Sequence, residues 1–160
     1  MTDNNAVTII AFSGDLDKLF ASFTIATGAA ASGMKVNMFF TFWGLKLIQQ
    51  EGSKPKGLNW MQKMFGWMVK PGPEKRSISK MNMLGAGPMM LKKLMKKSNV
   101  PSLKEMMTSA KSLGVKMTAC TTSMQVMGIN KESLIPEVDN IAGVASFLAE
   151  AKESSMTLFI

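Results

Sequence analysis

The sequence of 160 residues contains no histidine, no tyrosine and a single cysteine, Cys120. Without histidine, catalytic groups of the Ser-His-Asp and Cys-His types, histidine metal ligands and histidine pH switches are all excluded. One cysteine can form neither a disulfide within the chain nor a cysteine-rich metal site. Any chemistry must therefore use Cys120, lysine, arginine, carboxylates, hydroxyls or backbone amides.

Acidic residues are scarce in the middle of the chain. The net charge is +8, but residues 46–97 alone contain twelve basic and two acidic side chains. Such a segment favours anionic partners, among them an acidic protein or a membrane surface. No nucleic-acid-binding motif accompanies the charge, so we expect no nucleic-acid partner.

Long hydrophobic runs are also missing. Residues 19–34 are uncharged, but this stretch is shorter than the ~20 residues that span a bilayer and is rich in small and hydroxyl side chains. Residues 1–5 are polar and lack the basic region of a secretory signal. We therefore expect a cytoplasmic protein with no transmembrane segment and at most peripheral membrane contact.

Apolar runs typical of strands alternate with amphipathic stretches typical of helices. Residues 6–12 form a continuous β-branched run, as in a strand buried on both faces, and Asp15 follows as a candidate helix N-cap. We expect further strands at 35–40, 115–120, 138–142 and 156–160, and helices within 16–33, 42–50, 88–97, 102–114, 123–127 and 143–153. This alternation predicts an α/β, Rossmann-like (flavodoxin-like) fold with a five-stranded, mostly parallel sheet and helices on both faces.

Two of the expected helices have features that can be checked. Ser102 and Glu105 have the spacing of a capping box. In the helix at 143–153, we expect the apolar side chains of Val144, Phe147, Leu148 and Ala151 to face inward.

We predict one domain over residues 1–160, with an insertion at about residues 51–87. The insertion is rich in glycine, proline, lysine and methionine, and it encloses one amphipathic stretch at 58–68. The 17 methionines fill a core or interface, or form an adaptable binding surface. The chain has no phosphate-binding glycine loop and no metal-ligand pattern, so we predict neither a cofactor nor a metal.

Cys120 is the strongest candidate for chemistry. It falls at the carboxyl end of the predicted third strand, where sites form in open α/β sheets, and a helix N-terminus beyond it would stabilise a thiolate. Thr121, Thr122 and Ser123 supply hydroxyls and amides to stabilise an anion or a persulfide. The alternative is a buried and inert thiol, because free cysteines are often buried.

Three separated segments carry a family pattern. They are residues 118–129 (TACTTSMQVMGI), residues 39–45 (FFTFWGL), and residues 80–85 (KMNMLG) followed by Met89-Met90. Together they resemble the DsrE-like sulfur-relay family (DsrE/DsrF/DsrH-like), in the branch labelled "peroxiredoxin family protein" or sulfurtransferase. The peroxidase label is not supported, because residues 113–120 lack the Pro-x-x-x-Thr-x-x-Cys pattern of peroxiredoxin sites.

The resemblance implies a self-associating Rossmann-like domain, with a trimer favoured over a dimer. It implies that sulfur is carried as a persulfide on Cys120 and exchanged with sulfur carriers of the TusA type or with rhodanese-type donors. We therefore predict a sulfur carrier or sulfurtransferase acting through Cys120. The alternative is a non-catalytic binding module that uses its basic, methionine-rich insertion on a protein or membrane surface.

Overall fold

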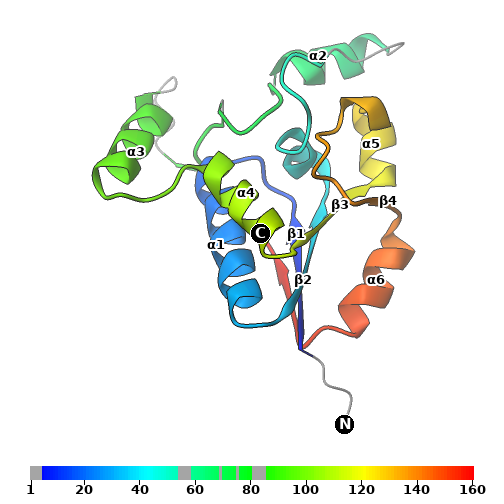
Figure 1. Cartoon of the computed structure of the whole chain (residues 1–160). Helices are drawn as coiled ribbons and strands as arrows, with labels where there is room; N and C mark the ends of the chain where they lie inside the picture. Colours follow the sequence, from blue (N-terminus) through cyan, green and yellow to red (C-terminus); the bar gives the residue numbers. More distant parts are fainter. Residues whose placement is uncertain (1–4, 54–58, 69, 75, 81–85) are drawn as a thin grey trace.

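The computed structural model describes residues 5–53, 59–68, 70–74, 76–80 and 86–160. Within these residues, five parallel strands form one sheet in the order β4-β3-β2-β1-β5 (Figure 1). The strands are β1 Ala6–Ala11, β2 Lys35–Phe40, β3 Lys116–Cys120, β4 Asn140–Ala142 and β5 Met156–Phe159. The predicted α/β fold class, with a five-stranded parallel sheet, is confirmed.

Helices cover both faces of this sheet (Figure 1). On one face, α1 and α4 pack against each other, whereas α6 lies on the opposite face. The α2 and α5 helices lie side by side beyond the carboxyl ends of the strands. The bounds are α1 Leu16–Ala31, η1 Phe42–Lys46, α2 Trp60–Met68, α3 Ala86–Lys97, α4 Leu103–Ser112, α5 Thr121–Met127, η3 Lys131–Ser133 and α6 Val144–Lys152, where η marks a 3-10 helix. None of the helices within the described ranges is both long and apolar enough to cross a membrane.

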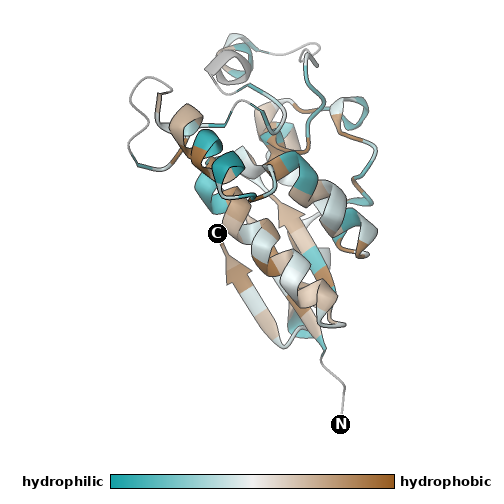
Figure 2. Ribbon diagram, turned by 60° about the vertical axis from the view of Figure 1, so that its left-hand side comes forward, coloured by the Kyte–Doolittle hydropathy of each residue, from teal (hydrophilic) through white to brown (hydrophobic). Residues whose placement is uncertain are grey.

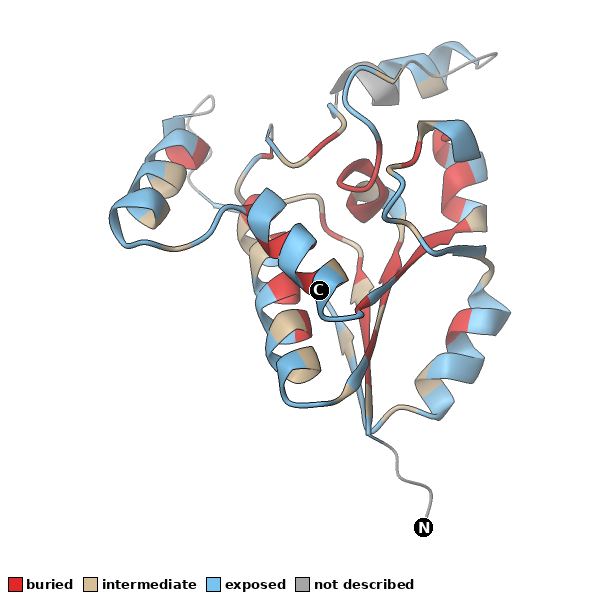
Figure 3. Cartoon of the chain, in the orientation of Figure 1, coloured by how far each residue is buried: buried red, intermediate tan, exposed pale blue. Residues whose placement is uncertain are grey.

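The core lies between the sheet and the pair α1 and α4. The central strands are mainly apolar (Figure 2) and mainly buried (Figure 3). Phe23 of α1 and Phe40 of β2 are fully buried, with their ring centroids 6.2 Å apart. The segment that follows β2 is also buried from position 44 to position 49, so the core continues past the end of the sheet.

The strand register brings the ends of four neighbouring strands to one level. Ala11 of β1 pairs with Phe40 of β2, and Phe40 in turn pairs with Ala119 of β3. Cys120, the last residue of β3, pairs with Ala142 of β4. The residues that follow these strands therefore emerge at the same carboxyl edge of the sheet.

The helices agree with the sequence expectations in part. The capping box of α4 is confirmed: the Ser102 hydroxyl accepts a hydrogen bond from the Glu105 amide, and the Glu105 carboxylate accepts one from the Ser102 amide.

The helix expected at 42–50 is wrong in type and length, because only the 3-10 turn η1 forms there. The expected inward orientation of Val144 and Leu148 is also wrong. These side chains are 59% and 58% exposed, because α6 buries only one residue, Phe147, against the sheet.

The turn η1 approaches β1 so closely that only glycine fits at position 44. A Cβ atom there would lie 2.0 Å from the carbonyl oxygen of Ala11. Two hydrogen bonds hold this contact, from the amide of Thr41 to Ala11 O (3.1 Å) and from the amide of Gly44 to Phe12 O (3.0 Å). The position of η1 above β1 is therefore fixed by a backbone-to-backbone contact.

This contact predicts opposite effects for two glycine-to-alanine changes. Gly44→Ala should lower the free energy of unfolding by about 3 kcal/mol or more, because the new methyl group meets a backbone oxygen that cannot move aside. Gly28→Ala is the matched control. It lies in α1 with open space around it and should raise the free energy of unfolding by about 0.5–1 kcal/mol. Urea denaturation measures both, and equal stabilities for the two variants would contradict the close approach.

Candidate functional site

Cys120 occupies the junction between a strand and a helix. It is the last residue of β3 and also the N-cap of α5, with extended backbone angles (φ −74°, ψ 116°). The helix was expected at 123–127, and its start is wrong by two residues because α5 begins directly after the strand, at Thr121. The thiol therefore sits at the carboxyl edge of the sheet, with the first turn of α5 beside it.

A hydroxyl pair lies next to the thiol. Thr41, the residue after β2, and Ser123, in the first turn of α5, share a hydrogen bond of 2.6 Å between their hydroxyl oxygens. The two residues come from segments far apart in the sequence, and they meet because β2 and β3 are neighbours in the sheet. The pair is partly shielded from solvent, since Ser123 is buried and Thr41 is half-buried.

The pKa of Cys120 lies below its ordinary value. Burial acts to raise it, but hydrogen bonds that favour the thiolate outweigh burial. They come from the Ser123 hydroxyl and amide, the Thr41 hydroxyl and the Thr122 amide. The described residues thus promote ionisation of the thiol through neutral donors, with no cationic partner among them, in a sequence that has no histidine.

The predicted stabilising residues differ in what they offer the thiol. Ser123 contributes its hydroxyl and its amide, and Thr122 contributes its amide while its side chain is exposed. Thr121 lines a neighbouring cavity of about 350 Å³ that also includes Gln125 and Ile141. Thr41 was not among the predicted site residues. One signal could have identified Thr41: it comes directly after the second predicted strand. In the structure this strand, β2, ends beside β3, which carries Cys120.

An apolar cluster covers the other side of Cys120, which is 6% exposed. The cysteine packs with Phe39 of β2 and Phe147 of α6, whose ring centroids are 4.9 Å apart. The thiol therefore lies at a boundary, with apolar side chains on one side and hydrogen-bond donors on the other. A buried thiol in a purely apolar environment would have a raised pKa instead.

The residue after Thr41 has an unusual backbone. Phe42 has a φ of +44°, in the left-handed region that side chains other than glycine rarely adopt. The residue is 42% exposed, and the centroid of its ring lies 5.6 Å from that of Phe12, which in turn lies 5.5 Å from that of Phe159. Strain of this kind costs about 1–3 kcal/mol and is frequent at functional sites.

The predicted insertion reaches this edge of the sheet. The side-chain amide of Gln62, in α2, donates hydrogen bonds to the carbonyl oxygens of Gln125 and Val126 at the end of α5, both at 3.2 Å. Of the sequence motif at 80–85, only Lys80 is among the described residues. The α2 helix is therefore attached to the same short helix that carries Ser123.

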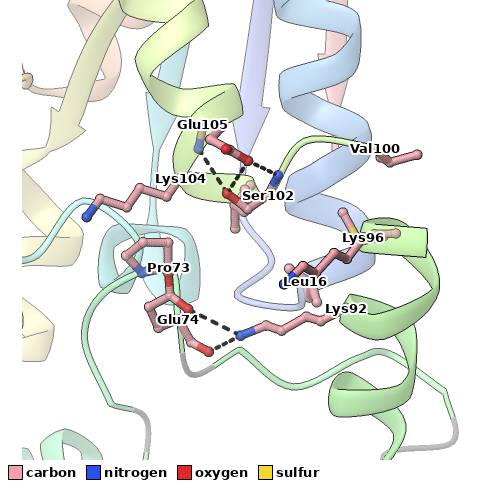
Figure 4. Close-up of a pocket in the computed structure, with 11 residues that line it drawn as sticks. Leu16, Pro73, Glu74, Lys92, Lys96, Val100, Ser102, Lys104 and Glu105 are labelled. Carbon is pink, nitrogen blue, oxygen red and sulfur yellow. Dashed lines mark hydrogen bonds and ion pairs between the residues drawn. The ribbon is translucent and has the colours of Figure 1, made fainter. Parts of the chain in front are cut away.

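A separate pocket of about 370 Å³ lies between α3 and the start of α4 (Figure 4). Its apolar wall includes Leu16 and Val100, and two of its charged residues, Lys92 and Glu74, form an ion pair. Cys120 is not among the lining residues.

Across the described part of the chain, no group of three or more carboxylates or thiols is arranged to hold a metal ion.

Comparison with known proteins gives relatives over nearly the full length. The chain is 44% identical over 153 residues to the uncharacterized protein YrkE of Bacillus subtilis, covering 96% of this chain and 95% of that one. It is 32% identical over 164 residues to the sulfur carrier protein DsrE2 of Allochromatium vinosum, covering 99% of each chain.

Solved structures show the same fold. The ychN protein of E. coli superposes with a TM-score of 0.55 at 15% identity, covering 97% of this chain and 98% of that one. A protein of unknown function, MTH1491 from Methanobacterium thermoautotrophicum, gives 0.56 at 10% identity, covering 96% and 97%. The family model described as DsrE/DsrF/DrsH-like matches residues 3–159. With this match and the two relatives above 30% identity, the chain belongs to the DsrE/DsrF/DrsH-like family.

Proposed function

We propose that the protein is a sulfur carrier that accepts sulfane sulfur as a persulfide on Cys120 and passes it to a partner protein. The observation that carries this proposal is the hydrogen-bonded environment of the thiol, in which Ser123 and Thr41 favour the thiolate. Support for a sulfur-relay role comes from the family match and from the relative named as a sulfur carrier, which aligns over 99% of both chains.

The proposed reaction needs only the groups that the site contains. The Cys120 thiolate attacks the outer sulfur of a donor persulfide, R–S–SH. A new sulfur–sulfur bond forms on Cys120, the sulfur–sulfur bond of the donor breaks, and the donor leaves as the thiolate R–S⁻. Delivery is the same exchange in reverse, with an acceptor thiolate attacking the outer sulfur on Cys120. No net oxidation occurs, so neither a second cysteine nor an external electron carrier is required.

The hydroxyl pair gives the site two roles in this exchange. Before loading, hydrogen bonds from Ser123 and Thr41 hold the thiolate, the nucleophilic form of cysteine. After loading, the same donors, with the amide of Thr122, can stabilise the anionic persulfide. The stabilising roles of Ser123, Thr122 and Thr121 are part of this proposal, with Thr121 contributing through the cavity that it lines.

Partners of the proposed relay must reach a mostly buried thiol. Sulfur carriers of the TusA type and rhodanese-type proteins would present a single persulfide or thiolate to the carboxyl edge of the sheet. The cavity beside Thr121 and the α2 helix, attached to α5 through Gln62, border that approach. We therefore propose a single DsrE-like domain whose insertion at about 51–87 contributes to partner docking.

A non-catalytic binding module is the competing function. It would use the basic, methionine-rich insertion and would not need Cys120. The two functions differ in their response to a thiol-blocking reagent, which stops sulfur transfer but leaves binding through the insertion intact. The hydrogen bonds that lower the pKa of Cys120 and the sulfur carrier among the full-length relatives favour the relay.

Self-association is the second part of the proposal. β5 is an edge strand, and it leaves Met156 and Phe159 49% and 67% exposed. On α6, which precedes β5 in the sequence, Val144 and Leu148 are also exposed. An exposed apolar edge is a liability in a monomer, so we propose a homo-oligomer that covers this surface, with a trimer favoured.

Replacing the thiol tests the relay directly. We expect Cys120→Ser to abolish sulfur loading from a persulfidated donor and to retain the circular dichroism spectrum, because serine is nearly isosteric but far less nucleophilic. Intact mass spectrometry should detect one added sulfur atom on the wild-type protein only. Equal loading of the wild type and the variant would refute the mechanism.

The pKa direction gives a second test. Alkylation of the single thiol by iodoacetamide, followed against pH, should give an apparent pKa below that of a free cysteine. Ser123→Ala and Thr41→Val should raise it, because each removes a hydrogen bond to the thiolate. Thr122→Ala is the matched control and should leave the pKa unchanged, because its contribution comes from the backbone amide.

A pH profile of alkylation that is identical in the wild type, Ser123→Ala and Thr41→Val would contradict the proposed role of the hydroxyl pair.

The lowered pKa of Cys120 also makes the free energy of unfolding depend on pH. Because this pKa is lower in the folded than in the unfolded protein, ionisation of Cys120 stabilises the folded state above the unfolded pKa. This stabilisation is lost as the pH falls through the folded pKa.

Light scattering tests the proposed oligomer. At micromolar concentration we expect a mass that is a multiple of the 17.4 kDa chain. Leu148→Lys should shift the protein toward the monomer, because a charge on the exposed apolar face opposes its burial. The exposed residue Lys93, on α3, provides a control, since Lys93→Met should not change the mass. A wild-type mass of one chain would overturn the proposal.

A further inference from the structure

Two cationic side chains are buried at the carboxyl edge of the sheet. Lys46, the last residue of η1, and Arg76, in the segment before α3, are each 3% exposed. Their segments are tied together by a hydrogen bond of 2.9 Å from the Gly72 amide to the Lys46 carbonyl oxygen. On the other side, the Leu16 amide donates to the Ser77 carbonyl oxygen at 2.7 Å, which holds the Arg76 segment against the start of α1.

The guanidinium of Arg76 is only partly satisfied. Its Nη2 donates to the carbonyl oxygen of Lys70. Its Nε and Nη1 are buried, and no hydrogen-bond partner for them exists in the described part of the chain. Lys46 donates from Nζ to the side-chain oxygen of Gln49 at 3.3 Å, which is a neutral acceptor. Buried donors without partners are rare, and buried charges are normally paired.

No carboxylate among the described residues forms an ion pair with either cation. Three ion pairs are present in those residues, and they join Lys18 to Asp15, Lys92 to Glu74 and Lys111 to Asp139. Asp15 attracts Arg76, but it also accepts hydrogen bonds from the hydroxyls of Ser13 and Ser77. Glu51 passes close to Gly72 with an exposed side chain. The positive charge of this pair therefore exceeds the negative charge around it.

The electrostatics of the pair agree with this excess. Burial lowers the pKa of Lys46, and the nearby charge of Arg76 lowers it further. Burial also lowers the pKa of Arg76, to about 10, although Asp15 acts in the opposite direction. Each cation is thus held in an environment that opposes its own charge. An anion bound by both would offset the burial penalty and the repulsion between them.

We propose that Lys46 and Arg76 form a binding site for a small dianionic oxyanion of the sulfate class. Two cations match a dianion in charge, and the unpartnered N–H groups of Arg76 match its oxygen acceptors. The near-complete burial of both side chains limits the ligand to a small anion. The site goes beyond the proposed sulfur transfer, because Cys120 is not part of it. It shares η1 with the thiol site, since Thr41 begins this turn and Lys46 ends it.

The test starts with the wild-type protein in a buffer whose only anion is monovalent chloride. Sulfate, thiosulfate and phosphate are added separately at constant ionic strength, and the melting temperature and the heat of binding are measured. We expect saturable binding and, at a concentration about a hundredfold above Kd, a rise in melting temperature of about 5 °C or more. The absence of saturable binding for all three anions would overturn the site, without the use of any variant.

Variants locate the response. Arg76→Gln and Lys46→Met should each lose the rise in melting temperature, whereas Lys93→Met, the same change at an exposed lysine, should retain it. In chloride alone, Lys46→Met should melt no lower than the wild type, because the change removes a buried charge that repels Arg76. A full response to the anions in both site variants would overturn the proposal.

Two further measurements distinguish the anion site from the proposed sulfur transfer and identify the class of anion that it binds. Cys120→Ser should bind the anions as the wild type does, so a failure of sulfur transfer would not affect the result. Equal responses to the three anions support a general oxyanion site, and a response to thiosulfate alone supports one that selects an anion carrying sulfane sulfur. Loss of anion binding in Cys120→Ser would contradict a site built from Lys46 and Arg76.

Discussion

The contact between Gly44 and the Ala11 carbonyl oxygen is the constraint on which the functional edge of this protein depends. It presses η1 onto the end of β1, at a distance that no side chain permits. Because η1 is only five residues long, both of its ends are fixed at once. Thr41, at its start, is held within hydrogen-bond distance of Ser123, and the carbonyl oxygen of Lys46, at its end, accepts a hydrogen bond from the amide of Gly72 in the segment that leads to Arg76. One close backbone contact thus positions groups from three distant parts of the chain.

The site illustrates how a chain without histidine can lower the pKa of a thiol. Burial of Cys120 favours the neutral form, and the packing of Phe39 and Phe147 excludes water from one side. Several neutral donors on the other side, each modest alone, together outweigh that penalty. A charge-assisted hydrogen bond to a thiolate is stronger than a hydrogen bond between neutral groups, so the donors gain strength only when the proton leaves. Such an arrangement favours ionisation without adding a titrating partner.

Much of the fold could be predicted from the sequence because its signals are local. The apolar run of β1 and the spacing of Ser102 and Glu105 each act within a few residues, and both predictions agree with the structure. The α6 helix shows the limit of this reasoning. Its apolar period is clear, but the period does not tell which apolar side chains are covered, and Val144 and Leu148 are exposed whereas Phe147 is buried.

The candidate site could be predicted only where it lies within one segment. Cys120 and Ser123 are close in sequence, whereas Thr41 joins them through the pairing of β2 with β3, an order that periodicity does not reveal. Lys46 and Arg76 belong to the basic segment at 46–97, and composition alone could not predict their burial, since lysine and arginine are rarely buried. The burial of this pair follows from two non-local hydrogen bonds, at Gly72 and Ser77, that fold the segment back onto the domain.

The place of β5 in the sheet has a consequence for how the protein is made. Val7 of β1 pairs with Met156 of β5, nearly the whole described chain apart in sequence. The amide of Phe12, whose carbonyl oxygen supports η1, donates a hydrogen bond to the carbonyl oxygen of Ile160 at 2.8 Å. During synthesis, β1 can pair with β2 early, but its second side stays open until β5 has left the ribosome. Contacts so distant in sequence slow folding, and the edge that supports η1 and Cys120 therefore becomes complete only when β5 has docked.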